Sequence, residues 1–168
     1  PAMRSSLQAY ISKSLRCIQQ KQTQVLLCLT LLTFIMLSGP IITCFPILAS
    51  KKFHASTLES GLIISCSSLA SGLAASLLPL LYRHLSSRAL LMSSCLCYGI
   101  ALCAISLIPT LWWLPAPILL YGLGQGLNVP IVSTLLTGQA PDEQRAAIMA
   151  ANAVLLRLGQ NIGPALFG

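Results

Sequence analysis

Five apolar stretches follow one another from Val25 to the end of this 168-residue chain, and each is about long enough to cross a bilayer. Hydrophobic residues make up 55% of the sequence and charged residues 8%, and nearly all of the charges lie between the stretches. A segment inside lipid must satisfy its backbone hydrogen bonds internally, and the sequence lacks the alternation that is typical of a membrane barrel. It therefore predicts an all-α, polytopic transmembrane helical bundle.

The apolar stretches also define the expected organisation of the chain. Residues 1–24 are basic with apolar residues at helical spacing, which predicts an amphipathic segment on the membrane surface, with a partly ordered loop as the open alternative. Pro40 and Pro46 are expected to loosen the second half of the first span. Because the chain begins with Pro1 rather than Met, we expect a piece of a longer protein. The five spans are expected at about residues 25–48, 60–82, 89–108, 116–136 and 146–168.

Basic residues are divided unevenly between the two ends of the predicted spans. Seven lie in the N-terminal segment and in the links at 82–88 and 137–145, whereas the opposite side holds only Lys51 and Lys52. The positive-inside rule then places the N-terminal segment in the cytoplasm. We therefore interpret the net charge of +7 as a determinant of membrane orientation and of contact with anionic lipid, and not as a sign of a nucleic-acid partner.

The sequence contains no constellation for catalysis or metal binding. Its three acidic residues, Glu59, Asp142 and Glu143, lie between the spans, so none can pair with a base inside them. Glu59 is typical of a helix start, where its charge complements the dipole. Most cysteines lie in apolar stretches and behave there as small hydrophobes, and Cys95-x-Cys97 would point its thiols to different faces of a helix. We therefore predict no enzyme, no metal and no cofactor.

The fourth span carries three polar residues beside a pair of glycines. Tyr121, Gln125 and Asn128 fall at positions i, i+4 and i+7, which predicts one polar stripe on a helix. Gly122 and Gly126 share a neighbouring face, where small residues let another helix approach closely. Polar groups in a span face protein or a water-filled cavity, so both a substrate-pathway role and interhelical hydrogen bonding alone remain open for the stripe.

The fifth span contains the one charge that lies inside a predicted helix. Arg157 lies eleven residues beyond Ala146, which is about 16 Å along a helix and near the midplane of a ~30 Å hydrocarbon core. An arginine there costs roughly 2.5–3.5 kcal/mol on insertion scales, a cost that a cavity or a partner offsets. Gln160 and Asn161 extend the same face, which indicates either a substrate contact or a hub that binds helix carbonyls.

A second face of this span is built for close packing. Asn152, Gly159 and Gly163 share it, and Pro164 is expected to kink the helix. In the link before the span, the segment from Pro141 to Arg145 predicts a helix start with acidic residues near its first turn.

Four local patterns of the sequence belong together. They are Phe53-x-x-Ser56 followed by 61–65; the basic turn from Arg83 to Arg88; Gly122-x-Gly124-x-Gly126 with Pro130, Pro141 and Arg145; and Gly159-x-x-x-Gly163-Pro164-x-x-Phe167-Gly168. Together they resemble one known family, the major facilitator superfamily of secondary transporters, and its drug-exporter branch in particular. The basic turn lacks the family's usual glycines and aspartate, and Phe167 stands where the exporter motif has a glycine.

The resemblance implies two six-helix halves that alternate access to a central site. We expect this chain to be most of the C-terminal half, helices seven to eleven, with residues 1–24 as the cytoplasmic linker between the halves. The implied activity is proton-coupled efflux of small amphipathic molecules or drugs across a bacterial inner membrane. Since the spans hold no acid, a coupling carboxylate is expected in the missing half. The alternatives are an importer or facilitator of a small solute, and a non-transporting membrane scaffold.

The resemblance also implies roles for the residues singled out above. The polar residues of the fourth and fifth spans would contact substrate, and the glycine–proline motif that ends at Gly168 would form a bent, closely packed helix. Arg83, Arg88 and Arg145 would hold the cytoplasmic loops and form ion pairs across a gate. The expected partners are a small-molecule substrate, protons, the missing half of the polypeptide and the lipid bilayer.

Overall fold

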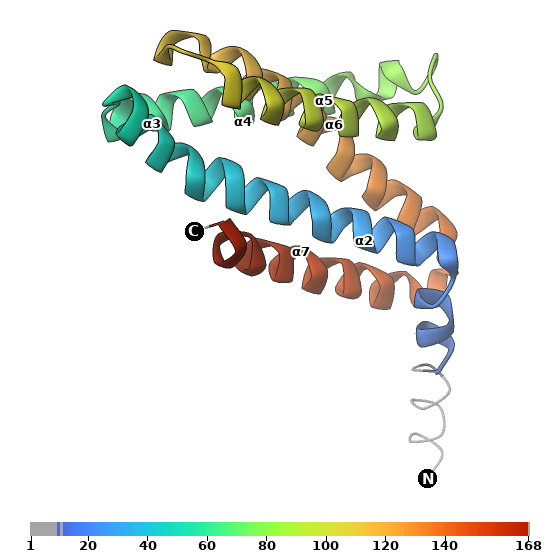
Figure 1. Ribbon diagram of the computed structural model, residues 1–168. Coiled ribbons are helices and arrows are strands. Elements are labelled where there is room, and N and C mark those ends of the chain that lie inside the picture. The colour runs from blue at the N-terminus through green and yellow to red at the C-terminus, as the bar shows by residue number, and fades with distance from the viewer. Residues whose placement is uncertain (1–9, 11, 168) are drawn as a thin grey trace. The chain divides into compact units, whose positions relative to one another are not determined.

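The computed structural model describes residues 10 and 12–167, and within these residues it contains helices and links but no strand. Residues 12–18 form a helical segment ahead of the first long helix. The predicted all-α fold class is therefore confirmed. The elements are α2 (Lys21–Met36), η1 (Leu37–Cys44), α3 (Phe45–Phe53), α4 (Thr57–Leu81), α5 (Ser87–Leu107), η2 (Leu111–Trp113), α6 (Pro115–Gln139), η3 (Asp142–Gln144) and α7 (Arg145–Phe167) (Figure 1).

Among the described residues, four helical segments are long and apolar enough to cross a membrane, and they correspond to the first four predicted spans. The fifth predicted span is also a helix, the 23-residue α7, but it is not among these candidates. Asn152, Arg157, Gln160 and Asn161 make α7 more polar than the other four. That α7 crosses the membrane stays a prediction. The four segments are Lys21–Phe53, Thr57–Leu81, Ser87–Leu107 and Leu111–Gln139.

The first spanning segment changes its helical winding where its prolines lie. Between α2 and α3, the segment η1 is a π-helix of eight residues that contains Pro40, and Pro46 lies in the first turn of α3. Proline removes a backbone donor and collides with the preceding turn of an α-helix, whereas the wider π-turn accommodates it. The loosening expected from these prolines is confirmed.

A capping box starts α4. The Ser56 side chain accepts a hydrogen bond from the Glu59 backbone N–H at 3.2 Å, and the Ser56 backbone N–H donates to Glu59 Oε2 at 2.7 Å. Two donors that the first helical turn leaves unpaired are thereby satisfied. The prediction that Glu59 marks a helix start is confirmed.

The end of α3 is tied to the end of α5. Lys52 Nζ donates to the carbonyl oxygen of Ile108 at 3.0 Å and lies 5.2 Å from the centre of the Phe53 ring. Ile108 caps α5 at its C-terminus, where a positive charge complements the helix dipole. His54 then ends α3 in the left-handed conformation, with φ at 53°.

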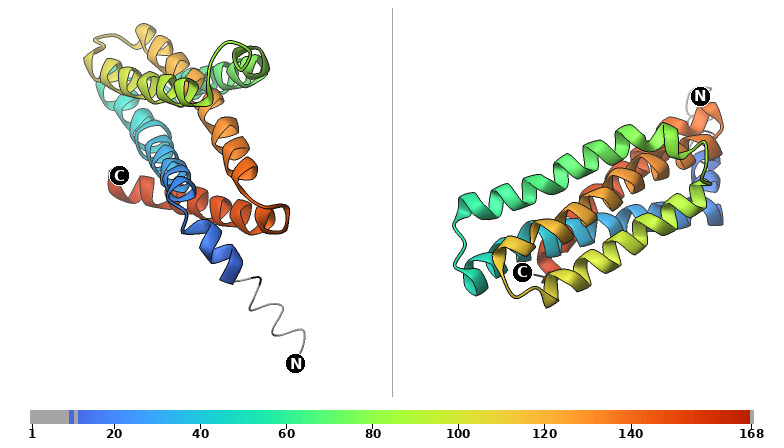
Figure 2. Two further views of the ribbon diagram at one scale, coloured as in Figure 1. Left: turned by 90° about the vertical axis from the view of Figure 1, so that its right-hand side faces the viewer. Right: turned by 90° about the horizontal axis from the view of Figure 1, so that it is seen from above.

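The chain divides into two compact units. One boundary between them lies inside η1, and another lies inside α6. The first unit contains the described residues up to Gly39 together with Val132–Leu166, and in it α2 and α7 lie side by side (Figure 1). The second unit contains Pro40–Ile131 and Phe167, and in it the first part of α6 lies between α4 and α5 (Figure 2).

Candidate functional site

Glycines on α6 let its backbone approach α4 closely. A Cβ atom placed on Gly122 would collide with the backbone of Ser67, 2.8 Å from its Cα, and one on Gly126 would meet Ser71 in the same way. Such contacts are shorter than any real Cβ atom makes, so only glycine fits at either position. Two helices that meet in this way gain dispersion contacts along the whole crossing, which is the main source of helix association in lipid.

On its other side, α6 contacts α5 through the predicted polar stripe. The rings of Tyr121 and Tyr98 lie 4.8 Å apart between centres, and Asn128 Nδ2 donates to Ser94 Oγ at 3.2 Å. Tyr121 is 0% exposed and Asn128 1%, whereas Gln125 is half-buried. Within this unit, Tyr121 and Asn128 thus contact α5, and the substrate-pathway role of the stripe stays a prediction.

The hydroxyl oxygens of Tyr98 and Tyr121 are both buried, and neither has a hydrogen-bond partner among the described residues. A buried hydroxyl without a partner costs free energy, so each is a place where a water molecule or a polar ligand group would be favourable. Sequence reasoning missed Tyr98 and Ser94. Both lie in a largely apolar stretch of α5. They are recognised only through their contacts with Tyr121 and Asn128 on α6.

The predicted polar face of α7 is present as a local network. Arg157 donates from Nη1 to Gln160 Oε1 at 3.2 Å, and Asn161 Nδ2 donates to the Arg157 carbonyl at 2.8 Å. Arg157 and Asn161 are exposed and Gln160 is half-buried. These three residues lie in the first unit, and Tyr121, Gln125 and Asn128 lie in the second. Among the residues that the structure describes, the guanidinium donates only to Gln160, so its other donors are able to bind an anionic or carbonyl-bearing group.

The opposite face of α7 packs closely on α2 and the start of η1. A Cβ atom on Gly159 would lie 2.8 Å from the Leu31 carbonyl oxygen, and one on Gly163 would lie 2.7 Å from the Ile35 carbonyl oxygen and 2.8 Å from the Gly39 backbone nitrogen. Pro164 follows inside the helix, and Gly168 lies outside the described residues. The glycine pair and the proline thus occur where two helices come together.

One buried hydrogen bond links the same two helices. Thr30 Oγ1 donates to Asn152 Oδ1 at 2.8 Å, and both side chains are buried. The sequence placed Asn152 on the packing face of its helix but did not identify Thr30 as its partner, because threonine is common in apolar helices and carries no distinctive signal.

Replacing Thr30 with valine is expected to lower the free energy of unfolding by about 0.6 kcal/mol and by no more than about 1.7 kcal/mol, the average and the maximum found for such bonds between helices in lipid. The reason is that Asn152 Oδ1 loses its donor. A double-mutant cycle with Asn152→Leu, measured by reversible unfolding of the full chain in detergent, isolates this coupling. Thr137→Val is the control, since the Thr137 hydroxyl bonds only within its own helix. Strictly additive single effects would contradict the expectation.

The three arginines predicted to hold loops lie at helix ends. Arg83 and Arg88 are exposed in and beside the turn between α4 and α5. Arg145 donates from Nε to the Thr137 carbonyl at 3.1 Å and forms a 2.9 Å ion pair with Asp142. Both of these partners lie in or beside the link between α6 and α7, so Arg145 stabilises that link locally. Within residues 10 and 12–167, no group of histidine, cysteine or acidic residues is placed to hold a metal ion.

Comparison with known families decides the identity. A family model of the Major Facilitator Superfamily matches residues 9–168. The chain belongs to this superfamily. Searches of curated proteins and of solved structures found no match.

Membership of the major facilitator superfamily agrees with the four helical segments that are suited to a bilayer. The protein is a multi-pass integral membrane protein of a transporter family and not an enzyme, and its partners are a small-molecule substrate and the lipid bilayer. The close crossings of α6 on α4 and of α7 on α2 lie within the matched residues.

Proposed function

We propose that this chain is most of the C-terminal half of a secondary active exporter, which moves small amphipathic molecules out of the cell in exchange for protons. The observation that carries the proposal is the α7 segment Gly159-x-x-x-Gly163-Pro164, whose glycines pack against α2 and η1. This segment resembles the exporter motif, and a closely packed helix suits a part that must hold its shape while a transporter changes state.

The polar face of α7 supplies the proposed substrate contact. Arg157, Gln160 and Asn161 offer donors and acceptors on an exposed face, and a charged residue within a membrane-spanning helix by default faces a pathway or a partner. Within the second unit, Gln125 is half-buried on α6, the fourth span, and we propose it as a separate substrate contact. Tyr121 and Asn128 lie on the same helix and contact α5.

Proton coupling needs a group that titrates in the pathway, and all three acids of this chain lie at helix ends. We therefore place the coupling carboxylate in the other half of the transporter. The N-terminal segment is cytoplasmic in this proposal, with Arg83, Arg88 and Arg145 on the same side of a bacterial inner membrane. The exposed arginines of the turn between α4 and α5 are then available for ion pairs across a cytoplasmic gate.

The test is an efflux assay with ethidium in bacterial cells that lack their own exporters and express the complete reading frame containing this chain. We expect ethidium to leave the cells faster than from empty-vector cells, and a protonophore to abolish the difference. Accumulation of a solute instead of efflux would favour an importer, and absence of transport in either direction would favour a scaffold.

Within this assay, Arg157→Leu is expected to lower the efflux rate about ten-fold, because removing a charge-assisted contact costs on the order of 1.4 kcal/mol or more. Arg157→Lys keeps the positive charge but loses the planar guanidinium with its paired N–H donors, so an intermediate efflux rate is expected. Ala153→Leu changes an exposed position of the same helix and serves as the control. Unchanged efflux by correctly folded Arg157→Lys and Arg157→Leu proteins would remove the arginine from the pathway.

A further inference from the structure

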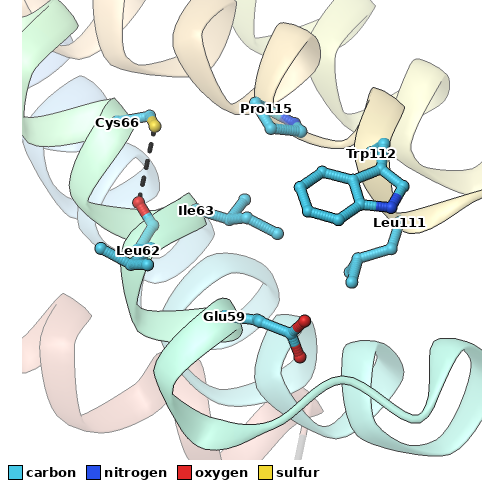
Figure 3. Close-up of a pocket in the computed structure, with 7 residues that line it drawn as sticks. All are labelled: Glu59, Leu62, Ile63, Cys66, Leu111, Trp112 and Pro115. Atoms are coloured by element: carbon cyan, nitrogen blue, oxygen red, sulfur yellow. Dashed lines mark hydrogen bonds between the residues drawn. The ribbon is translucent and has the colours of Figure 1, made fainter.

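An apolar cavity of about 230 Å³ lies in the second unit, between the first turns of α4 and the η2 turn that leads into α6. Figure 3 shows the side chains of Ile63 and Trp112 pointing toward one another across it, with Pro115 and Cys66 on one side and Glu59 on the other. Leu62 and Leu111 complete the lining. Apart from Glu59, every side chain that lines the cavity is apolar or a weakly polar thiol or indole.

Glu59 is the only acidic residue between Pro40 and Ile131, so its carboxylate is an isolated negative charge in this unit. Both hydrogen bonds that it accepts, from the Ser56 backbone N–H and from Ser56 Oγ, end on Oε2. Oε1 therefore has no partner among the described residues. A carboxylate oxygen beside an apolar cavity favours a ligand with an ammonium group attached to an apolar body.

The place and size of the cavity indicate which ligand of that kind it takes. Trp112 is 84% exposed and Leu62 61% exposed, so the cavity opens to the outer surface of the helices and not into a closed core. Tryptophan prefers the interface between headgroups and hydrocarbon, and Trp112 and Trp113 lie together at this end of the spans. Pockets for drug-sized ligands hold about 300–1,000 Å³, so this smaller cavity fits one part of a molecule that otherwise remains in the bilayer.

We propose that the cavity binds a phospholipid whose headgroup ends in a primary ammonium, with the ammonium on Glu59 Oε1 and the adjoining apolar part of the lipid against Trp112 and Ile63. A primary ammonium donates hydrogen bonds that a quaternary ammonium lacks, so the site distinguishes phosphatidylethanolamine from phosphatidylcholine. The lipid phosphate lies toward the N-terminus of α4, where the helix dipole is positive.

The chain contains two tryptophans, so Trp113→Phe leaves Trp112 as the only fluorescent indole. The full chain with this change is placed in phosphatidylcholine vesicles that contain a small fraction of either phosphatidylethanolamine or phosphatidylcholine with brominated acyl chains. Bromine quenches a nearby indole. We expect brominated phosphatidylethanolamine to associate with Trp112 about five-fold more strongly than brominated phosphatidylcholine.

Glu59→Gln is expected to abolish this preference, while glutamine retains the role of glutamate in the capping box and so keeps the helix start. Glu143→Gln removes an acid that does not line the cavity and is expected to leave the preference unchanged. Should Glu59→Gln fail to fold, Ile63→Phe fills the cavity without a change of charge and is expected to abolish the preference by itself.

Equal quenching by the two brominated lipids would overturn the proposal, and so would a preference that survives Glu59→Gln. Dodecylammonium carries the same primary ammonium group as the proposed lipid headgroup, on a soluble single-chain molecule, and serves as a competitor. A preference that disappears at micromolar dodecylammonium would reassign the cavity to a soluble amphipathic cation, whereas persistence of the preference supports the lipid. None of these measurements depends on transport activity.

Discussion

Replacing Gly126 with valine is expected to prevent the stable fold, with a loss of more than about 4 kcal/mol in the free energy of unfolding. A Cβ atom at this position collides with the backbone of Ser71, 2.8 Å from its Cα, and a backbone cannot rotate out of the way as a side chain does. The helices α4 and α6 would have to separate, which removes their dispersion contacts. The measurement is the yield of monodisperse protein in mild detergent, followed by thermal unfolding.

Gly138 is the matched control because it lies on the same helix and a Cβ atom there meets nothing within 4 Å. Gly138→Ala is expected to leave the fold intact, and to raise stability by up to about 1 kcal/mol through the better helix propensity of alanine. A Gly126→Val protein as stable as the Gly138→Ala protein would mean that α4 and α6 do not cross where the structure places them.

Replacing Gly163 with valine is expected to abolish transport, with a loss of at least about a hundred-fold in rate in the ethidium assay. The added side chain would lie against the Ile35 carbonyl and the Gly39 backbone nitrogen, so α7 could no longer rest on α2 and η1. A displacement of even about 1 Å in a part that positions substrate costs on the order of a hundred-fold in rate. Gly163→Ala adds only the Cβ atom, and a smaller loss is expected.

The control for Gly163 is Ala165→Val, two residues further along α7 at an exposed position. It adds comparable bulk to the same helix and is expected to retain efflux. Expression of each variant must be equal by immunoblot, since a variant that is degraded also fails to transport. Wild-type efflux by Gly163→Val would show that the close approach of α7 to α2 is dispensable.

The positions of the helices could be predicted from the sequence because apolar length and helix-start residues are local signals. Four spans, the role of Glu59 as a helix start and the loosening at Pro40 all follow from residues that act on their own neighbourhood. The fifth segment was predicted as a span on its length, yet its composition is more polar than that of the other four. Residues such as Arg157 and Asn161 lower its apolar content, and length alone does not reveal this.

The partners across helices could not be predicted, because periodicity shows which residues share a face and not what that face contacts. Gly122 and Gly126 were placed on one packing face, but nothing in their spacing identifies Ser67 and Ser71 as the contacts. The same holds for Tyr121, because nothing in the sequence of α5 identifies Tyr98 as its neighbour. Pairing is decided by tertiary packing, which the pattern of a single helix does not contain.

The uneven charge at the two ends of the second unit has an electrical consequence. One end of this unit carries Lys51, Lys52 and Glu59, a net of one positive charge, and the other carries Arg83 and Arg88 without an acid. Reversing the unit in a membrane would therefore move one net charge through the whole voltage, at about 2.3 kcal/mol for each 100 mV. In the proposed orientation, a cell that is negative inside therefore favours the arginine end of this unit at its inner face through the voltage itself, and this contribution is largest when the membrane is energised.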